Sequence, residues 1–279
     1  MIEHMEPDES TPEKPLPEWV LLEYFHMLQQ VGIVGGKQQQ DIQTGRHEEE
    51  GGTGSSTTKM QDNHAGGHSS SSSSQVFFSH LSHATCGALR DEINQRAGSV
   101  VGGGLLPSPI ANILPAAPSS SPIAVERLGR CVCTGLSILE LLKTVGVPLS
   151  EVCLLDPKAT EELSPGDGMR FEWFLFGGIL GDDPPRDRTA ELRLCGFPSR
   201  HLGPIQMTTD TALAVTKKIV QDGHSLHTLP WALHPELVFG PREQVQMPFR
   251  YLAHPDGTPV MPDGMKELIR KDLDRAFEF

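Results

Sequence analysis

The sequence lacks the features that would place the protein at a membrane or outside the cell. It has no apolar run of about 18 residues and no leader with a basic start and an apolar core. Its 5 cysteines are odd in number and irregularly spaced, which does not fit a disulfide framework. We therefore expect a soluble, non-secreted protein with reduced thiols and no membrane partner. The expected compartment is the cytoplasm, with the nucleus as the alternative.

Common short motifs of nucleotide-binding and hydrolytic enzymes are also missing. The sequence holds no G-x-G-x-x-G turn after a strand, no Gly-Lys-Ser/Thr phosphate loop, no serine nucleophile elbow and no zinc-peptidase helix. His64 and His68 lie in a polar tract where nothing would fix the geometry of a metal site, and Cys131-x-Cys133 lacks a partner pair. We therefore predict no metal centre.

Two segments contain few side chains that could build a core. Residues 36–75 hold 7 glycines and 8 serines, and in residues 98–122 more than half of the positions are Gly, Ser or Pro. Such segments bury too little apolar surface to offset the entropy that is lost on ordering. We interpret both as disordered insertions in one domain of residues 1–279, because the remainder is long enough for a single α/β domain.

The chain is acidic, with a formal net charge of −13, of which residues 36–75 contribute only −2. No extended basic patch interrupts this surplus. A surface of this sign repels a phosphate backbone and attracts basic partners. We therefore expect a basic protein partner and no direct contact with nucleic acid.

Short apolar runs alternate with helical patterns, most regularly after residue 151. Strands are predicted at 1–4, 75–81, 152–156, 170–178 and 201–207. Helices are predicted at 18–32, 88–96, 136–146, 189–195 and 209–223, several of which end at glycine. Repeated strand-then-helix order favours an α/β fold: a mostly parallel sheet with helices on both faces.

Three loops follow the carboxyl ends of predicted strands, at residues 154–159, 177–188 and 202–210. Ligands of open α/β sheets bind at that edge. In the middle loop, Gly177 and Gly178 allow a close backbone approach, while Pro184 and Pro185 stiffen a turn that carries three aspartates. These loops are the predicted binding edge, although a surface turn with solvated charges would show the same residues.

The three loops, in this order, resemble the cofactor loops of the SPOUT class of S-adenosylmethionine-dependent methyltransferases. The resemblance is closer to a subfamily that includes a fungal protein-arginine methyltransferase acting on a ribosomal protein. It rests on the blocks "IEHME", "EWVLLEY", "CLLDP", "FGGILGD-x-PPRDRT", "RHLG-x-x-QMTTDTA" and "MPFRY", which reach from Ile2 to about Asp272 and skip both insertions. The resemblance implies a C-terminal trefoil knot, which periodicity alone would not predict.

The resemblance also implies that the cofactor is S-adenosylmethionine and that the three loops hold it. The predicted cofactor-binding residues are Leu155, Asp156, Pro157, Gly178, Leu202, Gly203, Met207, Thr208 and Thr209. Leucine and methionine side chains would form apolar walls, glycines would admit close backbone contact, and the threonine hydroxyls would lie at a helix start. Ordinary core packing is the alternative for Leu155, Leu202 and Met207.

An arginine acceptor is cationic, so carboxylates must hold it, align one nitrogen and assist the loss of a proton. The predicted catalytic residues are Asp182 and Asp187 in the middle loop and Glu3 near the end of the first strand. By resemblance the substrate is a basic ribosomal protein, the third protein of the small subunit. The alternatives are a tRNA or rRNA methyltransferase and a cofactor-binding protein without turnover, and the choice between monomer and homodimer stays open.

Overall fold

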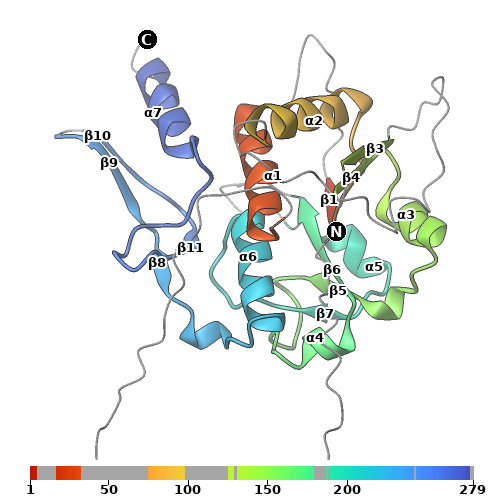
Figure 1. The fold of residues 1–279 in the computed structure, drawn as a ribbon. Coiled ribbons are helices and arrows are strands. Elements are labelled where there is room, and N and C mark those ends of the chain that lie inside the picture. Colours follow the sequence, from red (N-terminus) through yellow and green to blue (C-terminus); the bar gives the residue numbers. More distant parts are fainter. Residues whose placement is uncertain are drawn as a thin grey trace, which may run out of the picture. The chain divides into compact units, whose positions relative to one another are not determined.

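The computed structural model describes residues 1–4, 17–32, 75–97, 125–128, 131–178, 187, 189–241 and 243–276. Seven strands of these residues form one sheet in the order β3-β4-β2-β1-β6-β5-β7 (Figure 1). The strands are β1 (Ile2–His4), β2 (Val76–Ser79), β3 (Val125–Leu128), β4 (Cys131–Thr134), β5 (Val152–Leu155), β6 (Trp173–Gly178) and β7 (Ser199–Arg200). Every neighbouring pair is parallel except β3 and β4.

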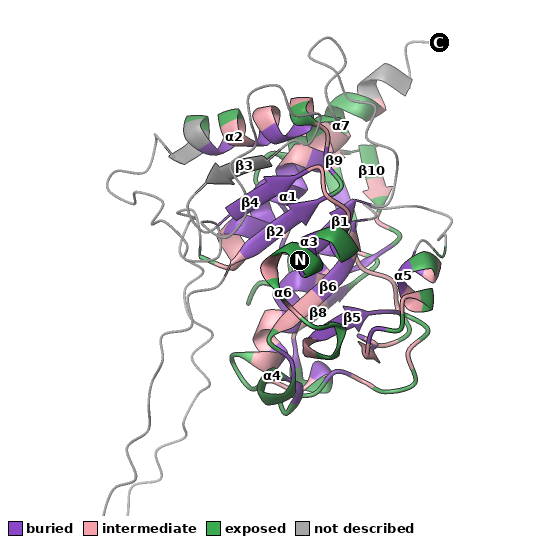
Figure 2. Cartoon of the chain, turned by 90° about the vertical axis from the view of Figure 1, so that its right-hand side faces the viewer, coloured by how far each residue is buried: buried purple, intermediate pink, exposed green. Residues whose placement is uncertain are grey.

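Side chains of the strands alternate between the two faces of the sheet and so enter two separate cores. In β2, for example, Phe78 packs into one cluster and Phe77 into the other, and both are fully buried. The first face packs against α1 (Glu18–Gln30), α2 (His83–Ala97) and α6 (Thr209–Val220), and the second against α3 (Ile138–Val145) and α5 (Ala190–Leu194). Figure 2 shows the neighbouring strands β4, β2 and β1 of the sheet as a buried layer. The predicted α/β sheet with helices on both faces is therefore confirmed.

The first residues of the chain lie in the middle of this sheet. β1 pairs in parallel with β2 on one side and with β6 on the other, and Ile2 lies opposite Phe78 and Phe176. The expected strand at residues 1–4 is thus present. All three of its residues are buried, as expected of a central strand, although Glu3 and His4 are polar.

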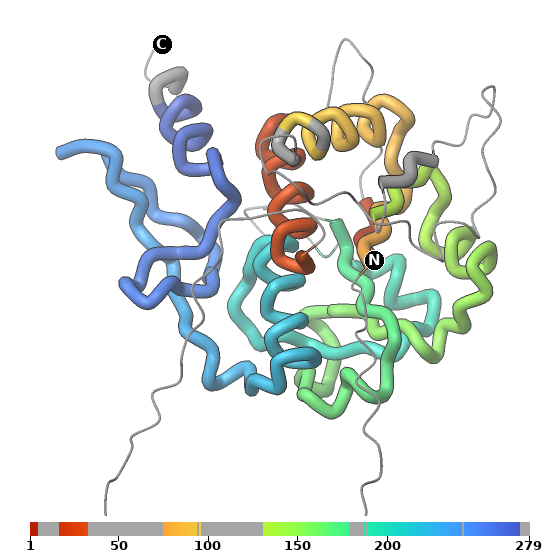
Figure 3. The backbone as a smooth tube through the Cα atoms, viewed as in Figure 1, coloured from red at the N-terminus to blue at the C-terminus, as the bar shows by residue number. Residues whose placement is uncertain are grey.

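Local signals set the ends of the helices as predicted in most cases. α3 begins with a capping box between Ser137 and Glu140 and ends at Gly146, whose φ of 71° favours glycine. α1 is buried more widely than one amphipathic stripe requires, since Tyr24 and Met27 are as buried as Leu28. The reason is that α1 contacts α2, α6 and α7 as well as the sheet; Figure 3 shows α1 beside α6, far apart in sequence.

The strand predicted at 201–207 is wrong. β7 ends at Arg200, and beyond it only His201 forms an isolated bridge, to Glu162. The chain then turns, because Gly203 has a φ of +84° and Pro204 has no N–H to donate to a neighbouring strand. Residues 201–207 therefore form a loop that lies at the edge of the sheet, between β7 and α6.

Beyond α6 the chain forms two antiparallel pairs and a last helix. The elements are β8 (Trp231–Leu233), β9 (Glu236–Gly240), β10 (Glu243–Gln246), β11 (Arg250–Leu252) and α7 (Met265–Ala276). β9 pairs with β10 and β8 with β11. Shorter turns are α4 (Asp167–Arg170) and the 3₁₀ helices Leu149–Glu151 and Leu226–Thr228.

The predicted insertions at 36–75 and 98–122 lie outside the described residues, except for Gln75. The assignment of residues 1–279 to a single domain therefore stays a prediction. None of the helices in the described residues is long and apolar enough to cross a membrane.

Candidate functional site

A cavity of about 430 Å³ opens at the carboxyl ends of β5 and β6. Its walls come from three loops and from the first turns of α6, as expected for a parallel sheet. The lining residues are Leu155, Asp156, Pro157, Lys158, Phe176, Gly177, Asp187, Thr189, Leu202, Gly203, Pro204, Ile205, Gln206, Met207, Thr209 and Ala212. Most of this surface is apolar side chain or backbone, and the charged groups belong to Asp156, Lys158 and Asp187.

The loop after β7 is held in place by Arg250 of β11. The Arg250 guanidinium donates to the Leu202 carbonyl and stacks 4.1 Å from the ring centroid of Trp231, while the Arg250 backbone N–H donates to the Gln206 carbonyl at 3.0 Å. A Cβ added at Gly203 would lie 3.0 Å from Arg250 Nη2. Glycine at this position therefore permits both the positive φ and the close approach of the arginine.

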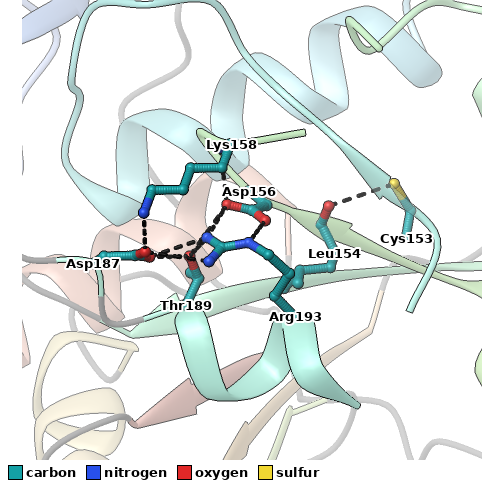
Figure 4. A network of polar contacts seen from close by, with 7 residues as sticks. All are labelled: Cys153, Leu154, Asp156, Lys158, Asp187, Thr189 and Arg193. Carbon is teal, nitrogen blue, oxygen red and sulfur yellow. Dashed lines mark hydrogen bonds and ion pairs between the residues drawn. The ribbon is translucent and has the colours of Figure 1, made fainter. Parts of the chain in front are cut away.

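The opposite wall of the cavity is an ionic network around Arg193 (Figure 4). Arg193 donates to the buried Asp156 from Nε at 2.5 Å and from Nη2 at 2.7 Å, and to Asp187 from Nη1 at 3.2 Å and from Nη2 at 3.0 Å. Lys158 Nζ lies 2.5 Å from Asp187 Oδ2, and the Thr189 hydroxyl donates to both carboxylates at 3.3 Å. The network ties the turn after β5 to the start of α5.

These contacts keep both carboxylates ionised. Burial alone would raise the pKa of Asp156, but hydrogen bonds from Arg193 and from the Lys158 backbone N–H outweigh it and hold that pKa below its usual range. The pKa of Asp187 is held well below its usual range by hydrogen bonds from Arg193 and Lys158. The same partners raise the pKa of Arg193.

Seven of the nine residues predicted to bind a cofactor line the cavity: Leu155, Asp156, Pro157, Leu202, Gly203, Met207 and Thr209. Gly178 and Thr208 are not among the lining residues. A Cβ at Gly178 would lie 2.8 Å from the Glu3 carbonyl, so this glycine serves the close pairing of β6 with β1. Thr208 is the N-cap of α6, and its hydroxyl pairs with that of Thr211 at 2.9 Å.

The three predicted catalytic residues lie in three different settings. Asp187 lines the cavity but already pairs with Lys158 and Arg193. Glu3 is buried outside the lining, accepts a hydrogen bond from Ser79, and its Oε1 lies 3.9 Å from His80 Nδ1; burial raises its pKa. Asp182 lies outside the described residues. The catalytic assignment therefore stays a prediction.

Eight lining residues were not among the individually predicted site residues: Lys158, Phe176, Gly177, Thr189, Pro204, Ile205, Gln206 and Ala212. Most are neighbours of predicted residues. Three lie between Gly203 and Met207, where the backbone itself forms the wall, and Ala212 follows Thr209 by one helical turn. The three predicted loops include all of them except Thr189 and Ala212, which lie just beyond the loops, and Phe176, which reads as ordinary core.

A model of the family described as "Protein arginine N-methyltransferase SFM1-like" matches residues 110–276, which is more than half of the chain. The chain belongs to this SFM1-like family. A stretch of 144 residues is 48% identical to the protein arginine N-methyltransferase SFM1 of Saccharomyces cerevisiae. It covers 50% of this chain and 65% of the yeast protein, which is less than two thirds of that relative.

Solved structures of this family share the fold. Yeast arginine methyltransferase SFM1 complexed with SAM aligns with a TM-score of 0.61 and 30% identity, covering 97% of this chain and 89% of that chain. The complex with SAH gives a TM-score of 0.60 and 29% identity, covering 96% and 92%. The resemblance and the fold class predicted from the sequence are thereby confirmed, while the trefoil knot stays a prediction.

Proposed function

We propose that this chain is an S-adenosylmethionine-dependent protein arginine N-methyltransferase. The observation that carries the proposal is the cavity at the carboxyl edge of β5 and β6, in a chain of the SFM1-like family. The yeast structures that share this fold are complexes with SAM, SAH and MTA. Membership of the family favours a protein arginine as the acceptor.

The cavity fits S-adenosylmethionine in size and in chemistry. Its volume of about 430 Å³ lies in the ordinary range for small-molecule sites. Leu155, Leu202 and Met207 would pack against the apolar faces of the adenine ring. The backbone groups between Gly203 and Gln206 would form hydrogen bonds with its polar edge. When bound, the cofactor supplies an electrophilic methyl group on a sulfonium.

Two arginines hold the walls of the proposed cofactor site in place. The Arg193 network fixes the turn at Asp156 and keeps the wall rigid, and Arg250 fixes the loop from Leu202 to Gln206. Rigid walls contribute to catalysis because methyl transfer is an in-line displacement, in which much of the rate comes from positioning. In this proposal Asp182, Asp187 and Glu3 are the catalytic carboxylates.

We further propose that the substrate is a basic protein of the small ribosomal subunit, its third protein, and that residues 152–221 form the trefoil knot. The net charge of −13 supports a basic protein over RNA, because an acidic surface steers cations toward the site and repels phosphates. An experimental structure that traces the chain through residues 152–221 tests the knot.

The function is tested by transfer of labelled methyl groups from S-adenosylmethionine in an extract that lacks the endogenous enzyme. We expect label in a basic protein of the small subunit, recovered as methylarginine after hydrolysis. Label that is found only in a ribonuclease-sensitive fraction would replace the proposal by an RNA methyltransferase. Cofactor binding without transfer to any fraction would identify a protein without turnover.

A further inference from the structure

A second cavity, of about 200 Å³, lies where α1, the start of α6, β11 and α7 meet. Its lining residues are Trp19, Glu23, Thr208, Asp210, Met247, Phe249, Tyr251, Met261, Pro262, Met265, Leu268, Ile269 and Asp272. The volume is several times the roughly 30 Å³ that one water occupies in the liquid, so there is room for a side chain. The cofactor proposal makes no use of this cavity.

Two buried carboxylates of the cavity lack part of their hydrogen bonding. Glu23 is 4% exposed and Asp210 is 1% exposed. Within the described part of the chain, Glu23 Oε2 and Asp210 Oδ1 have no hydrogen-bond partner. Buried carboxyl oxygens without hydrogen-bond partners are costly, which indicates that a donor is missing from the cavity.

The chemistry of the walls specifies the missing donor. Three carboxyl groups line the cavity, from Glu23, Asp210 and the exposed Asp272, and the described lining holds no lysine, arginine or histidine. Trp19, Phe249 and Tyr251 supply aromatic faces. A cation with several N–H donors and a flat surface satisfies both features, because guanidinium binds carboxylates through paired hydrogen bonds and stacks on aromatic rings.

The second cavity shares a wall with the first. The segment that enters α6 alternates between them: Met207 and Thr209 line the first cavity, while Thr208 and Asp210 line the second. Reactants in the two cavities would therefore lie near each other at the first turn of α6. Methyl transfer requires the acceptor nitrogen to reach the methyl carbon directly, so in this proposal the two molecules meet at that turn.

The Asp210 carboxylate is also held in position by His26 of α1. His26 Nδ1 lies 2.7 Å from Asp210 Oδ2, and the Gln30 amide Nε2 lies 2.6 Å from His26 Nε2. Because the Gln30 amide donates to Nε2, the hydrogen of the neutral ring is on Nδ1 and is donated to Asp210. One carboxylate oxygen of Asp210 is thereby fixed, and the other is left to bind a ligand.

We propose that the second cavity, hereafter the guanidinium pocket, receives the side chain of the substrate arginine and that Glu23 and Asp210 hold its guanidinium. This inference rests on the proposed function and assigns the acceptor site within it. Asp210 is the proton acceptor in this assignment. As the N–C bond forms and the C–S bond breaks, the sulfur keeps the electron pair, and the guanidinium nitrogen gives its proton to the Asp210 carboxylate.

Methyl transfer to purified proteins of the small ribosomal subunit tests the proposal. We expect Glu23→Gln and Asp210→Asn to lower kcat/KM for the protein acceptor by roughly 100-fold, with a large part of the effect in the KM of the acceptor, since each removes one partner of a buried charge pair. Their dissociation constants for S-adenosylhomocysteine should stay within about twofold of wild type. Retained cofactor affinity also shows that each variant is folded.

Matched controls come from α1 and from the turn that follows α6. Glu18 is an exposed carboxylate at the start of α1 and Asp222 is an exposed carboxylate two residues after the end of α6, so Glu18→Gln and Asp222→Asn remove the same charge outside the pocket. Both controls should transfer methyl groups at the wild-type rate. Equal losses in the controls and in the pocket variants would overturn the assignment, because they would trace the effect to net charge.

A binding experiment separates the pocket from the reaction. N-acetyl-arginine amide should bind the protein and perturb Trp19 fluorescence, whereas the neutral isostere N-acetyl-citrulline amide should bind at least tenfold more weakly. Loss of this fluorescence change in a Trp19→Phe variant would show that Trp19 is its source. Equal binding of the two probes, or unchanged arginine binding in Glu23→Gln, overturns the guanidinium pocket even if methyl transfer is observed. Arginine-selective binding without any methyl transfer would instead overturn the proposed function alone.

Calorimetry with the wild-type protein gives a second readout that needs no variant. Burial and the charge of Asp210 raise the pKa of Glu23 well above its usual range. The groups that face it are His26 on its own helix, Asp210 on α6, Tyr251 on β11 and Asp272 on α7. An incoming guanidinium should ionise Glu23 and release a proton, seen as a dependence of the binding heat on buffer at pH 7. Binding without proton release argues against Glu23 as its partner.

Discussion

Arg193 brackets the carboxylate of Asp156 with two hydrogen bonds, from Nε at 2.5 Å and from Nη2 at 2.7 Å. Asp156 is 1% exposed on its side chain, whereas Arg193 is 32% exposed, so the arginine covers a charge that would otherwise be buried alone. Because Arg193 also binds Asp187, one side chain joins two of the three loops that line the first cavity.

Replacing Arg193 by alanine should therefore affect stability and ligand binding together. We expect Arg193→Ala to lower the free energy of unfolding by about 1–3 kcal/mol, because the buried Asp156 loses its charged partner. The affinity for S-adenosylhomocysteine should fall as the turn loosens. Urea unfolding and calorimetry measure the two effects, and the exposed Arg270→Ala serves as control.

The aspartates of the middle loop give a kinetic prediction. If Asp182 and Asp187 act on the substrate, Asp182→Asn and Asp187→Asn should reduce methyl transfer more than they reduce cofactor affinity. The structure adds a pH signature for Asp187, whose pKa is held low by Arg193 and Lys158. Stability contributed by its charge is present at neutral pH and is lost as the pH falls through its depressed pKa. Turnover unchanged in both variants would remove the assignment.

Gly203 and Gly223 form a natural pair for testing the loop after β7. Their φ values are +84° and +76°, so alanine should cost about 1–2 kcal/mol of stability at either position. A Cβ at Gly203 also meets Arg250 Nη2 at 3.0 Å, while nothing lies within 4 Å at Gly223. We expect only Gly203→Ala to weaken the binding of S-adenosylhomocysteine. An equal loss of affinity in Gly223→Ala would contradict the role given to this loop.

The raised pKa of Glu23 predicts that folding stability falls as the pH rises, which is the opposite of the pH dependence predicted for Asp187. Above the ordinary pKa of about 4.5, an unfolded chain ionises this carboxyl while the folded chain keeps it protonated. The folded state then binds the extra proton, so its stability relative to Glu23→Gln falls as the pH rises from 4.5 toward the folded pKa. Glu23→Gln should be the more stable protein at pH 8, with the difference shrinking toward pH 4. Denaturation curves across this range measure it.

Much of the fold follows from local patterns in the sequence. Apolar runs of strand length and helices that end at glycine predict β5, β6, α3 and α6, and the order of elements predicts the parallel sheet. The segment 201–207 was misassigned because its apolar residues face a cavity. In the sequence, apolar side chains that line a pocket give the same pattern as the apolar side chains of a strand. Gly203 and Pro204 were the local signal against a strand.

The guanidinium pocket could not be predicted in the same way. Glu23 occurs among the apolar residues of α1, and Asp210 suits the first turn of any helix. Their meaning depends on contacts between segments that lie far apart in the chain, such as the pair of His26 and Asp210, which are 184 residues apart. The loops that line the first cavity, in contrast, were predicted because family resemblance and the rule for parallel sheets pointed to the same edge.

The central position of β1 has a consequence for how the molecule is made. During synthesis β1 emerges long before β6, yet Ile2 pairs with Phe176 on one side and with Phe78 on the other. Such non-local pairing slows folding, because a long loop must close before the contacts form. Until then β2 and β6 have unpaired edges, which are templates for aggregation. Loss of the first few residues should therefore split the sheet in its middle and leave insoluble protein, although no residue of either cavity is removed.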